Sequence, residues 1–390
     1  MGKPKHKKHL IFVHSIKGGT GKTTAALGLA QYFGGNGPGN VCYIDTDIVG
    51  VGTVLLAGEP PMKTENSKPD FTDFVLLNPF DNPEFYKTLF EDSPASLFRD
   101  FVRPPDETTH RNFKAVFSSL DEKLMKRAIQ ATSDMFFSED VEGKINILLE
   151  KLFGDGIDTI ILDTSPGMQG LTQIIFTIAK NMDKQGKLSL NENIEVEVIH
   201  VCIFTNNFAH LRGLYEFLKN EKDYYFKNKH QPVKFLLVIN QVSLGVEFKT
   251  VPEPSLYYDE YQLEEIKKNN PKVGEFAVYL KGNIEFYGLD LIHRAFVEYY
   301  SLKRKDFLQN CFELYEPQAS WYQDIDIIGD NVVIIPEQPE IRRAASNFGW
   351  EKGFDTGRFF KLLEAECESG HLGMLGRRVK EKMDLQKEKK

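Results

Sequence analysis

The fold is decided by the stretch Leu10 to Thr24, which reads LIFVHSIKGGTGKTT. Its first six residues predict a buried strand, and the glycines that follow predict a tight loop. Residues 25–33 have a helical pattern, so a helix follows the loop. A strand that enters a glycine-rich loop and leaves it as a helix is the context that a phosphate-binding loop requires.

The loop residues suit phosphate chemistry. Gly18, Gly19 and Gly21 let the backbone turn tightly and point successive N–H groups into one concavity. The helix that starts near Lys22 adds its positive dipole end, the Lys22 ammonium reaches the β- and γ-phosphates, and the Thr23 hydroxyl ligates Mg²⁺. The candidate cofactor-binding residues of the loop are Gly18, Gly19, Thr20, Gly21, Lys22, Thr23 and Thr24.

The composition is that of a globular protein. At 390 residues the chain can bury a large core, 41% of it is hydrophobic, and no uninterrupted apolar stretch approaches the ~18–20 residues of a membrane span. The four cysteines are scattered without a Cys-x-x-Cys pair, which argues against a zinc or iron–sulfur site and favours a reducing cytoplasm.

The formal net charge of −8 hides an asymmetry. Residues 1–10 carry four lysines and no acid, and residues 371–390 carry seven Lys or Arg against three acids. Each end is therefore +4, and the rest of the chain is −16. Such a chain can contact nucleic acid or anionic lipid only through its ends or a local basic patch.

Short apolar runs alternate with helical patterns, which predicts an α/β fold: a mostly parallel, doubly wound sheet covered by helices on both faces. We expect strands near residues 10–15, 41–44, 113–117, 159–163, 196–205, 235–240 and 332–335. We expect helices near residues 121–132, 140–153, 208–220, 339–347 and 354–368, and one from residue 171. Residues 1–370 are expected to form a single elaborated domain with helical, aromatic-rich insertions at about 56–112 and 241–330. Residues 371–390 are expected to form a basic C-terminal helix or tail.

Polar side chains follow several of these strands at their carboxyl ends. Asp45 and Asp47 come after residues 41–44, Asp163 ends the strand at 159–163, and Asn240 and Pro336 end two later strands. Ligands of open parallel sheets bind outside the carboxyl ends of the strands, so these residues should converge on the phosphate loop. Asp163 is placed to hold the Mg²⁺ shell, through water as Mg²⁺ prefers.

Lys17 stands directly before the paired glycines, while Ile16 occupies the position where the usual phosphate-loop pattern has its first glycine. The resulting sequence, KGGTGKTT, matches the deviant Walker A box and resembles the ParA/MinD family of dimeric P-loop ATPases, which also includes the anion-pump and tail-anchored-protein ATPases. The turn from Asp163 to Gly167, with Leu171 and Thr172 after it, resembles the switch II segment of ParA.

The resemblance implies a role for each matching residue. Asp47 would orient the attacking water, and Asp45 would support the magnesium shell or the switch. Lys17 would cross a dimer interface to the partner's phosphates, which implies an ATP-dependent homodimer. Asn240, Pro336 and Gln338 would line the adenine. The candidate catalytic residues are thus Lys17, Lys22 and Asp47, and the candidate metal ligands are Thr23, Asp45 and Asp163.

These observations predict a cytoplasmic, Mg²⁺-dependent ATPase that hydrolyses ATP slowly and acts as a dimerisation switch, ParA-like, in DNA or plasmid partition or in cargo positioning. The partner would be non-specific DNA. One alternative is an ATP-binding switch or scaffold that recruits protein partners through the two insertions. Another is a metabolic enzyme on the same loop, but no second cluster of His, Cys or acids accompanies the loop.

A third alternative is a membrane-associated, MinD-like positioning ATPase. Apolar residues repeat at helical spacing at Leu372, Leu375, Val379 and Met383, with basic residues between them, as in an amphipathic membrane helix. The stretch lacks Phe and Trp, and Glu381 and Asp384 interrupt its basic face. We therefore do not expect membrane binding.

Overall fold

The structure is a computed structural model. It describes residues 7–36, 40–48, 70–76, 87, 97–98, 113–119, 121–132, 135–186, 194–205, 208–221, 224, 235–242, 332–336, 338, 340–341 and 356–384. The two expected insertions, at 56–112 and 241–330, lie mostly outside the described residues, and so does most of the helix expected at 339–347.

Seven parallel strands form one sheet in the order β3-β2-β4-β1-β5-β6-β7. The strands are β1 (Lys8–His14), β2 (Asn40–Asp45), β3 (Phe113–Val116), β4 (Ile157–Asp163), β5 (Val196–Phe204), β6 (Phe235–Val242) and β7 (Val332–Pro336). Each corresponds to a strand expected from the sequence, and the predicted α/β fold class is confirmed.

Both faces of the sheet are buried, which explains why its strands are nearly continuous apolar runs. In β1, Leu10 and Phe12 point into one hydrophobic core, and Ile11 and Val13 point into the other. All four side chains are fully buried. Alternate side chains of a strand point to opposite faces, so this one strand contributes side chains to both cores.

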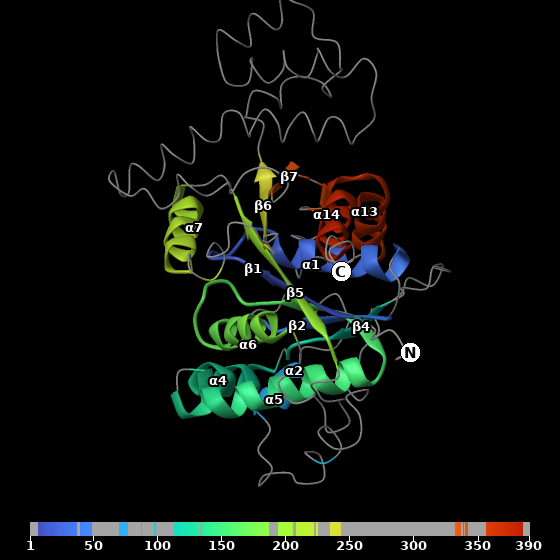
Figure 1. The fold of residues 1–390 in the computed structure, drawn as a ribbon. Coiled ribbons are helices and arrows are strands. Elements are labelled where there is room, and N and C mark those ends of the chain that lie inside the picture. Colours follow the sequence, from blue (N-terminus) through green and yellow to red (C-terminus); the bar gives the residue numbers. More distant parts are fainter. Residues whose placement is uncertain are drawn as a thin grey trace, which may run out of the picture.

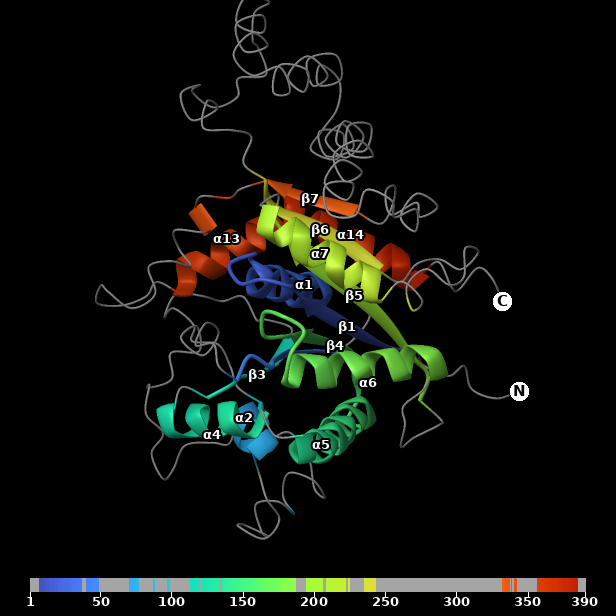
Figure 2. The same ribbon diagram turned by 90° about the vertical axis from the view of Figure 1, so that its left-hand side faces the viewer.

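Helices cover each face (Figure 1). On one face lie α1 (Lys22–Asn36), α13 (Thr356–Ser369) and α14 (His371–Asp384). On the other lie α2 (Phe71–Leu76), α4 (Glu122–Thr132), α5 (Met135–Gly154), α6 (Leu171–Gln185) and α7 (Phe208–Asn220). Figure 2, turned by 90°, shows the sheet between these two layers.

The strand order creates a switch point at β1, which lies between β4 and β5. The crossover through α1 leads from β1 toward the β3 edge, and the crossover through α6 leads from β4 past β1 to β5 on the opposite side. Open α/β sheets bind ligands at such a point, outside the carboxyl ends of the strands. The phosphate loop, which leaves β1, is at that position.

The short helix α2 was not expected from the sequence. Its N-terminus is closed by two reciprocal hydrogen bonds, because the Asp73 N–H donates to Asp70 Oδ1 at 2.9 Å and the Asp70 N–H donates to Asp73 Oδ2 at 3.0 Å. This is the geometry of a capping box, with Asp73 at the position where Glu or Gln is usual. Phe71, Phe74 and Val75 then bury its apolar face.

The apolar stripe of the C-terminal helix faces the protein core. Leu372, Leu375, Val379 and Met383 are buried in the same core as α1. The two helices approach closely through glycines: a Cβ at position 28 would lie 3.1 Å from Leu372 Cδ1, and one at position 376 would overlap the Tyr32 ring. The side chains that resembled a membrane-binding stripe are therefore used to dock α14.

Leu375 tests this docking, because its side chain is fully buried against α1 and the sheet. We expect Leu375→Ala to lower the free energy of unfolding by about 2–5 kcal/mol, through lost burial and the cavity left behind. Urea denaturation followed by circular dichroism measures this loss. Lys380→Ala, on the polar side of the same helix, is the control and should change stability little. Equal stability of Leu375→Ala and wild type would contradict the docking.

Candidate nucleotide-binding site

The phosphate loop has the backbone conformation that its glycines allow. Gly19 and Gly21 have φ angles of 75° and 78°, in the left-handed region that residues with a Cβ rarely adopt. The helix α1 begins immediately afterwards, at Lys22. The loop thus ends on a helix N-terminus, which favours anions.

Two hydrogen bonds hold carbonyl groups of the loop on its outer side. The Ser15 hydroxyl donates to the Lys17 carbonyl at 3.0 Å, and the Asn240 amide of β6 donates to the Thr20 carbonyl at 2.7 Å. In a planar trans peptide the following N–H points opposite to the carbonyl. The N–H groups of Gly18 and Gly21 therefore point away from these two partners, the orientation that a phosphate cradle needs.

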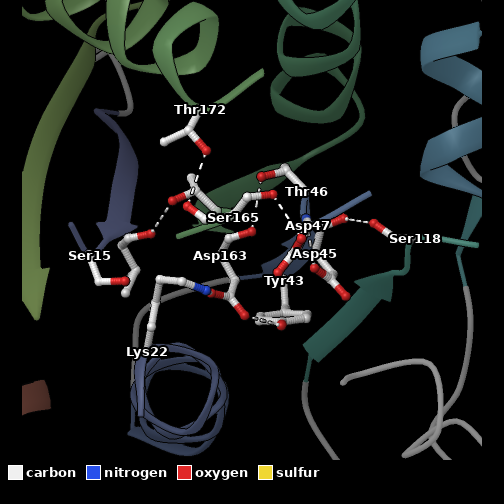
Figure 3. A network of polar contacts seen from close by, with 12 residues as sticks. Ser15, Lys22, Tyr43, Asp45, Thr46, Asp47, Ser118, Asp163, Ser165 and Thr172 are labelled. Carbon is white, nitrogen blue, oxygen red and sulfur yellow. Dashed lines mark hydrogen bonds and ion pairs between the residues drawn. The ribbon is translucent and has the colours of Figure 1, made fainter. Parts of the chain in front are cut away.

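A buried ion pair joins the loop to β4. The Lys22 Nζ atom lies 2.7 Å from Asp163 Oδ1, and the two side chains are only 6% and 1% exposed. The other carboxylate oxygen, Oδ2, accepts a hydrogen bond from the Tyr43 hydroxyl of β2 at 2.9 Å. Figure 3 shows Lys22 and Tyr43 converging on Asp163 from α1 and from the neighbouring strand.

A second buried carboxyl, Asp45, lies beside this pair. Asp45 is opposite Asp163 in the register of β2 and β4, and it accepts the Asp47 N–H on Oδ1 at 2.9 Å. Burial raises the pKa of Asp45 well above its usual range, and the neighbouring Asp163 charge raises it further. The site concentrates negative charge that a metal ion would offset.

Asp47 is bonded to the turn after β4. The Ser165 hydroxyl donates to Asp47 Oδ1 at 2.8 Å, and the Thr172 hydroxyl of α6 donates to the Ser165 carbonyl at 3.1 Å. The same turn contacts the phosphate loop, because the Gly167 N–H donates to the Ser15 carbonyl at 2.8 Å. The two segments that resemble the family's switches are thus linked to each other and to the loop.

Lys17 is exposed at the tip of the loop, beside α7. Burial lowers the pKa of His210 on α7, and the nearby Lys17 charge lowers it further. Three residues later on α7, Gly213 accommodates Ile16: a Cβ at position 213 would lie 2.7 Å from Ile16 Cγ2. The isoleucine that replaces the usual first glycine of the loop therefore packs against α7.

The structure brings together most of the residues that the sequence singled out. The loop, Asp45, Asp47, Asp163 and Asn240 all lie at the carboxyl ends of β1, β2, β4 and β6. Thr23 and Thr24 are half-buried in the first turn of α1.

Two of the residues expected to line adenine have described contacts with other parts of the chain. Gln338 donates to Glu366 Oε2 on α13 at 2.6 Å, and no described contact joins it to the loop. Pro336 ends β7, paired with Val242. The adenine-lining roles of Asn240, Pro336 and Gln338 stay predictions.

Sequence reasoning missed Tyr43, Ser15 and Ser165. A tyrosine inside a fully buried strand carries a hydroxyl that needs a partner, and this was a usable signal for Tyr43. The serines gave no such signal, because serine is common in turns.

The site residues fit a phosphate group. The Thr20 hydroxyl oxygen is buried within the loop and has no hydrogen-bond partner among the described residues, so a ligand can satisfy it. If the Lys22 ammonium group gives up its bond to Asp163, it can bond phosphate oxygens instead. Within the described ranges, no group of three or more His, Cys, Asp or Glu is arranged to hold a metal ion.

Comparisons with known proteins give matches only among solved structures, since no protein-family model and no curated protein matches the chain. Apo McdA from Cyanthece is 14% identical with a TM-score of 0.47, covering 97% of this chain and 100% of its own. MinD in the Aquifex aeolicus MinC:MinD complex is 13% identical with a TM-score of 0.45, covering 95% of each chain. A Borrelia burgdorferi plasmid partition protein bound to AMPPNP is 16% identical with a TM-score of 0.35, covering 67% of this chain and 82% of its own.

One of these neighbours is described as a plasmid partition protein, and another comes from a cell division protein complex. At such identities the likeness is one of general fold. None of the helices within the described parts of the chain combines the length and apolar character needed to cross a membrane.

The raised pKa of Asp45 predicts a pH-dependent cost in stability. The unfolded chain releases this proton near pH 4, whereas the folded chain holds it to higher pH, so stability falls as the pH rises from about 4 through the folded pKa. Asparagine has no proton to lose and still accepts the Asp47 N–H. We therefore expect Asp45→Asn to raise the melting temperature of the nucleotide-free protein by a few degrees at pH 8 and little at pH 4.5.

Thermal denaturation at both pH values measures this difference. Asp155→Asn, in the exposed turn before β4, is the control and should change neither value. An Asp45→Asn melting temperature at or below that of the wild type at pH 8 would contradict the electrostatic account.

Proposed function

We propose that the chain is a Mg²⁺-dependent ATPase that works as an ATP-driven dimerisation switch of the ParA type, in partition or in positioning of a cargo such as DNA. The supporting observation is the buried pair of Lys22 and Asp163 at the end of a phosphate loop. Bound ATP supplies the transferable phosphoryl group, and Mg²⁺ offsets its charge.

The charges of the pair match those two groups. On binding, Lys22 would exchange its bond to Asp163 for bonds to phosphate oxygens, while Asp163 and Asp45 would face the hydrated cation with the Thr23 hydroxyl. Each buried charge of the nucleotide-free site then keeps an opposite charge beside it, which limits the cost of leaving ions buried.

Asp47 is the residue we assign to the attacking water. Its carboxylate is half-buried and held by Ser165, at the end of β2 next to Asp45. A positioned carboxylate orients water by accepting its protons, and phosphoryl transfer depends mainly on positioning and charge stabilisation. The link to the turn after β4 would couple this position to the state of the phosphate loop.

Lys17 is the residue we assign to a partner subunit. Its side chain is exposed, while Lys22, now paired with Asp163, would serve the phosphates of its own loop. A lysine presented outward beside the phosphates can stabilise charge at the site of a second copy, as an arginine finger does. Hydrolysis would then require the dimer.

Two substitutions distinguish a role in dimerisation from a role in ATP hydrolysis. Asp47→Ala should keep ATP binding, lose hydrolysis by about 100-fold or more, and accumulate the ATP-bound dimer. Lys17→Ala should keep ADP binding to the monomer and lose both ATP-dependent dimerisation and turnover. Light scattering after gel filtration measures the dimer, and phosphate release measures turnover.

Lys123→Ala, an exposed lysine on α4, is the matched control for Lys17→Ala. Its dimerisation and turnover should equal those of the wild type. Normal dimerisation and turnover of Lys17→Ala would contradict the assignment in trans, and wild-type turnover of Asp47→Ala would contradict the assignment of the water.

The cargo we favour is DNA bound without sequence preference. The basic residues Arg377, Arg378 and Lys380 lie on the docked helix α14, so they move with the ATP-binding domain. Dimerisation doubles such a surface and raises affinity steeply. The acidic remainder of the chain limits the number of phosphates it can reach.

Fluorescence anisotropy with random duplex DNA tests this choice, with ATP or ADP at two salt concentrations. We expect binding that is tighter with ATP and that weakens with salt at a log–log slope of about −0.9 per phosphate contacted. Sedimentation with anionic vesicles serves as the contrast and should show no binding, since the apolar stripe of α14 is buried. Absence of DNA binding at low salt would favour a protein partner instead.

A further inference from the structure

Asp163 is held by two side chains, and the proposed function gives only one of them, Lys22, a role in binding phosphate. The Lys22 ammonium bonds Oδ1 at 2.7 Å, and the Tyr43 hydroxyl bonds Oδ2 at 2.9 Å. Under the proposed function, on which this inference rests, Lys22 exchanges its bond for phosphate oxygens. Tyr43 then remains to hold the carboxylate.

The strands determine why Tyr43 can reach this position. Asp45 is opposite Asp163 in the β2–β4 register, and Tyr43 is two residues earlier on β2, on the same face of the sheet as Asp45. The tyrosine ring spans that distance along the strand and brings its hydroxyl to the carboxylate, as Figure 3 shows. A shorter polar side chain at position 43 would not reach.

The surroundings of Tyr43 hold its ring in place. Its side chain is fully buried, it belongs to the apolar core shared with α1, and its ring centroid lies 6.5 Å from that of Phe117. A phenylalanine would fill the same space. The hydroxyl is therefore the feature that packing alone does not require, and its partner is the carboxylate beside the phosphate loop.

We infer that Tyr43 is a positioning residue: its hydrogen bond fixes the Asp163 carboxylate in the orientation that receives the hydrated Mg²⁺ of the bound nucleotide. Residues that bond a metal-binding side chain from behind orient it, and their loss typically costs 10–100-fold in metal affinity. Tyr43 itself touches neither the nucleotide nor the cation.

Tyr43→Phe removes the donor and keeps the ring. Tyr224→Phe is the matched control, because the Tyr224 hydroxyl also donates to a carboxylate, Asp183 Oδ2 at 3.1 Å in the last turn of α6. The Tyr224 hydroxyl also lies 2.9 Å from His200 Nε2. Binding of a fluorescent ATP analogue to the full chain is measured in EDTA and then across a Mg²⁺ titration, with circular dichroism to verify the fold.

In EDTA, we expect Tyr43→Phe to bind the analogue as tightly as the wild type does. The Mg²⁺ concentration that gives half of the gain in analogue affinity should be about 10-fold higher or more in Tyr43→Phe than in the wild type. Tyr224→Phe should match the wild type in both. In an Asp163→Asn background, Tyr43→Phe should add nothing, because the carboxylate that it positions is gone.

An unchanged Mg²⁺ requirement in Tyr43→Phe, with a wild type that responds to Mg²⁺, would overturn this inference and leave the proposed function intact. A wild type that does not bind the analogue would overturn both. If Tyr43→Phe unfolds below the assay temperature, a variant with 3-fluorotyrosine at position 43 is used in the same Mg²⁺ titration. Fluorine makes the hydroxyl a stronger donor to the Asp163 carboxylate, so the Mg²⁺ requirement should shift, and an unchanged requirement would overturn the inference.

Discussion

The ion pair between Lys22 and Asp163 is the interaction on which the candidate site depends. Both side chains are almost completely buried. Removing two charges from water costs several kcal/mol per ion, so a buried pair is weak evidence for stability. It is better explained as an arrangement that keeps each charge paired until a ligand that carries both negative and positive charge binds. A phosphate group that carries a divalent cation is such a ligand.

The sheet order explains how this pair forms between residues 141 positions apart in the sequence. β4 adds directly beside β1, so the carboxyl end of β4 delivers Asp163 next to the loop that leaves β1. β2 lies on the other side of β4 and brings Tyr43, Asp45 and Asp47 to the same edge. Parallel pairing therefore collects polar residues of two strands, β2 and β4, and of the helix that follows β1 into one buried network, which no local sequence pattern does.

Sequence reasoning predicted the parts of the molecule that follow from strong periodic patterns. The seven strands and the loop are clear because buried parallel strands are apolar throughout and because glycines at fixed spacing have few other uses. The sequence argued against membrane binding by residues 371–390, but it did not show what their apolar stripe packs against. The close approach at Gly28 and Gly376 is visible only in three dimensions.

The polar details were harder to predict for a different reason. The sequence placed Asn240 at the site, and its predicted contact with adenine stays a prediction. The bond from its amide to the Thr20 carbonyl involves a backbone group that a sequence does not reveal. Tyr43 was hidden because its ring fits an apolar strand. Both cases involve one side chain that satisfies packing and polar demands together. The bounds of helix α2 were not predicted, because Asp73 stands where a capping box usually has Glu or Gln.

The central claim is that Lys22 binds the phosphates of a nucleotide, and calorimetric titration of the full chain with Mg·ATP tests it most directly. The account predicts saturable binding by the wild type at one site per chain. It predicts at least about 10- to 100-fold weaker binding by Lys22→Ala with an unchanged circular dichroism spectrum, because a charge-assisted bond to phosphate is lost. Equal affinity of the folded Lys22→Ala variant and the wild type would contradict it.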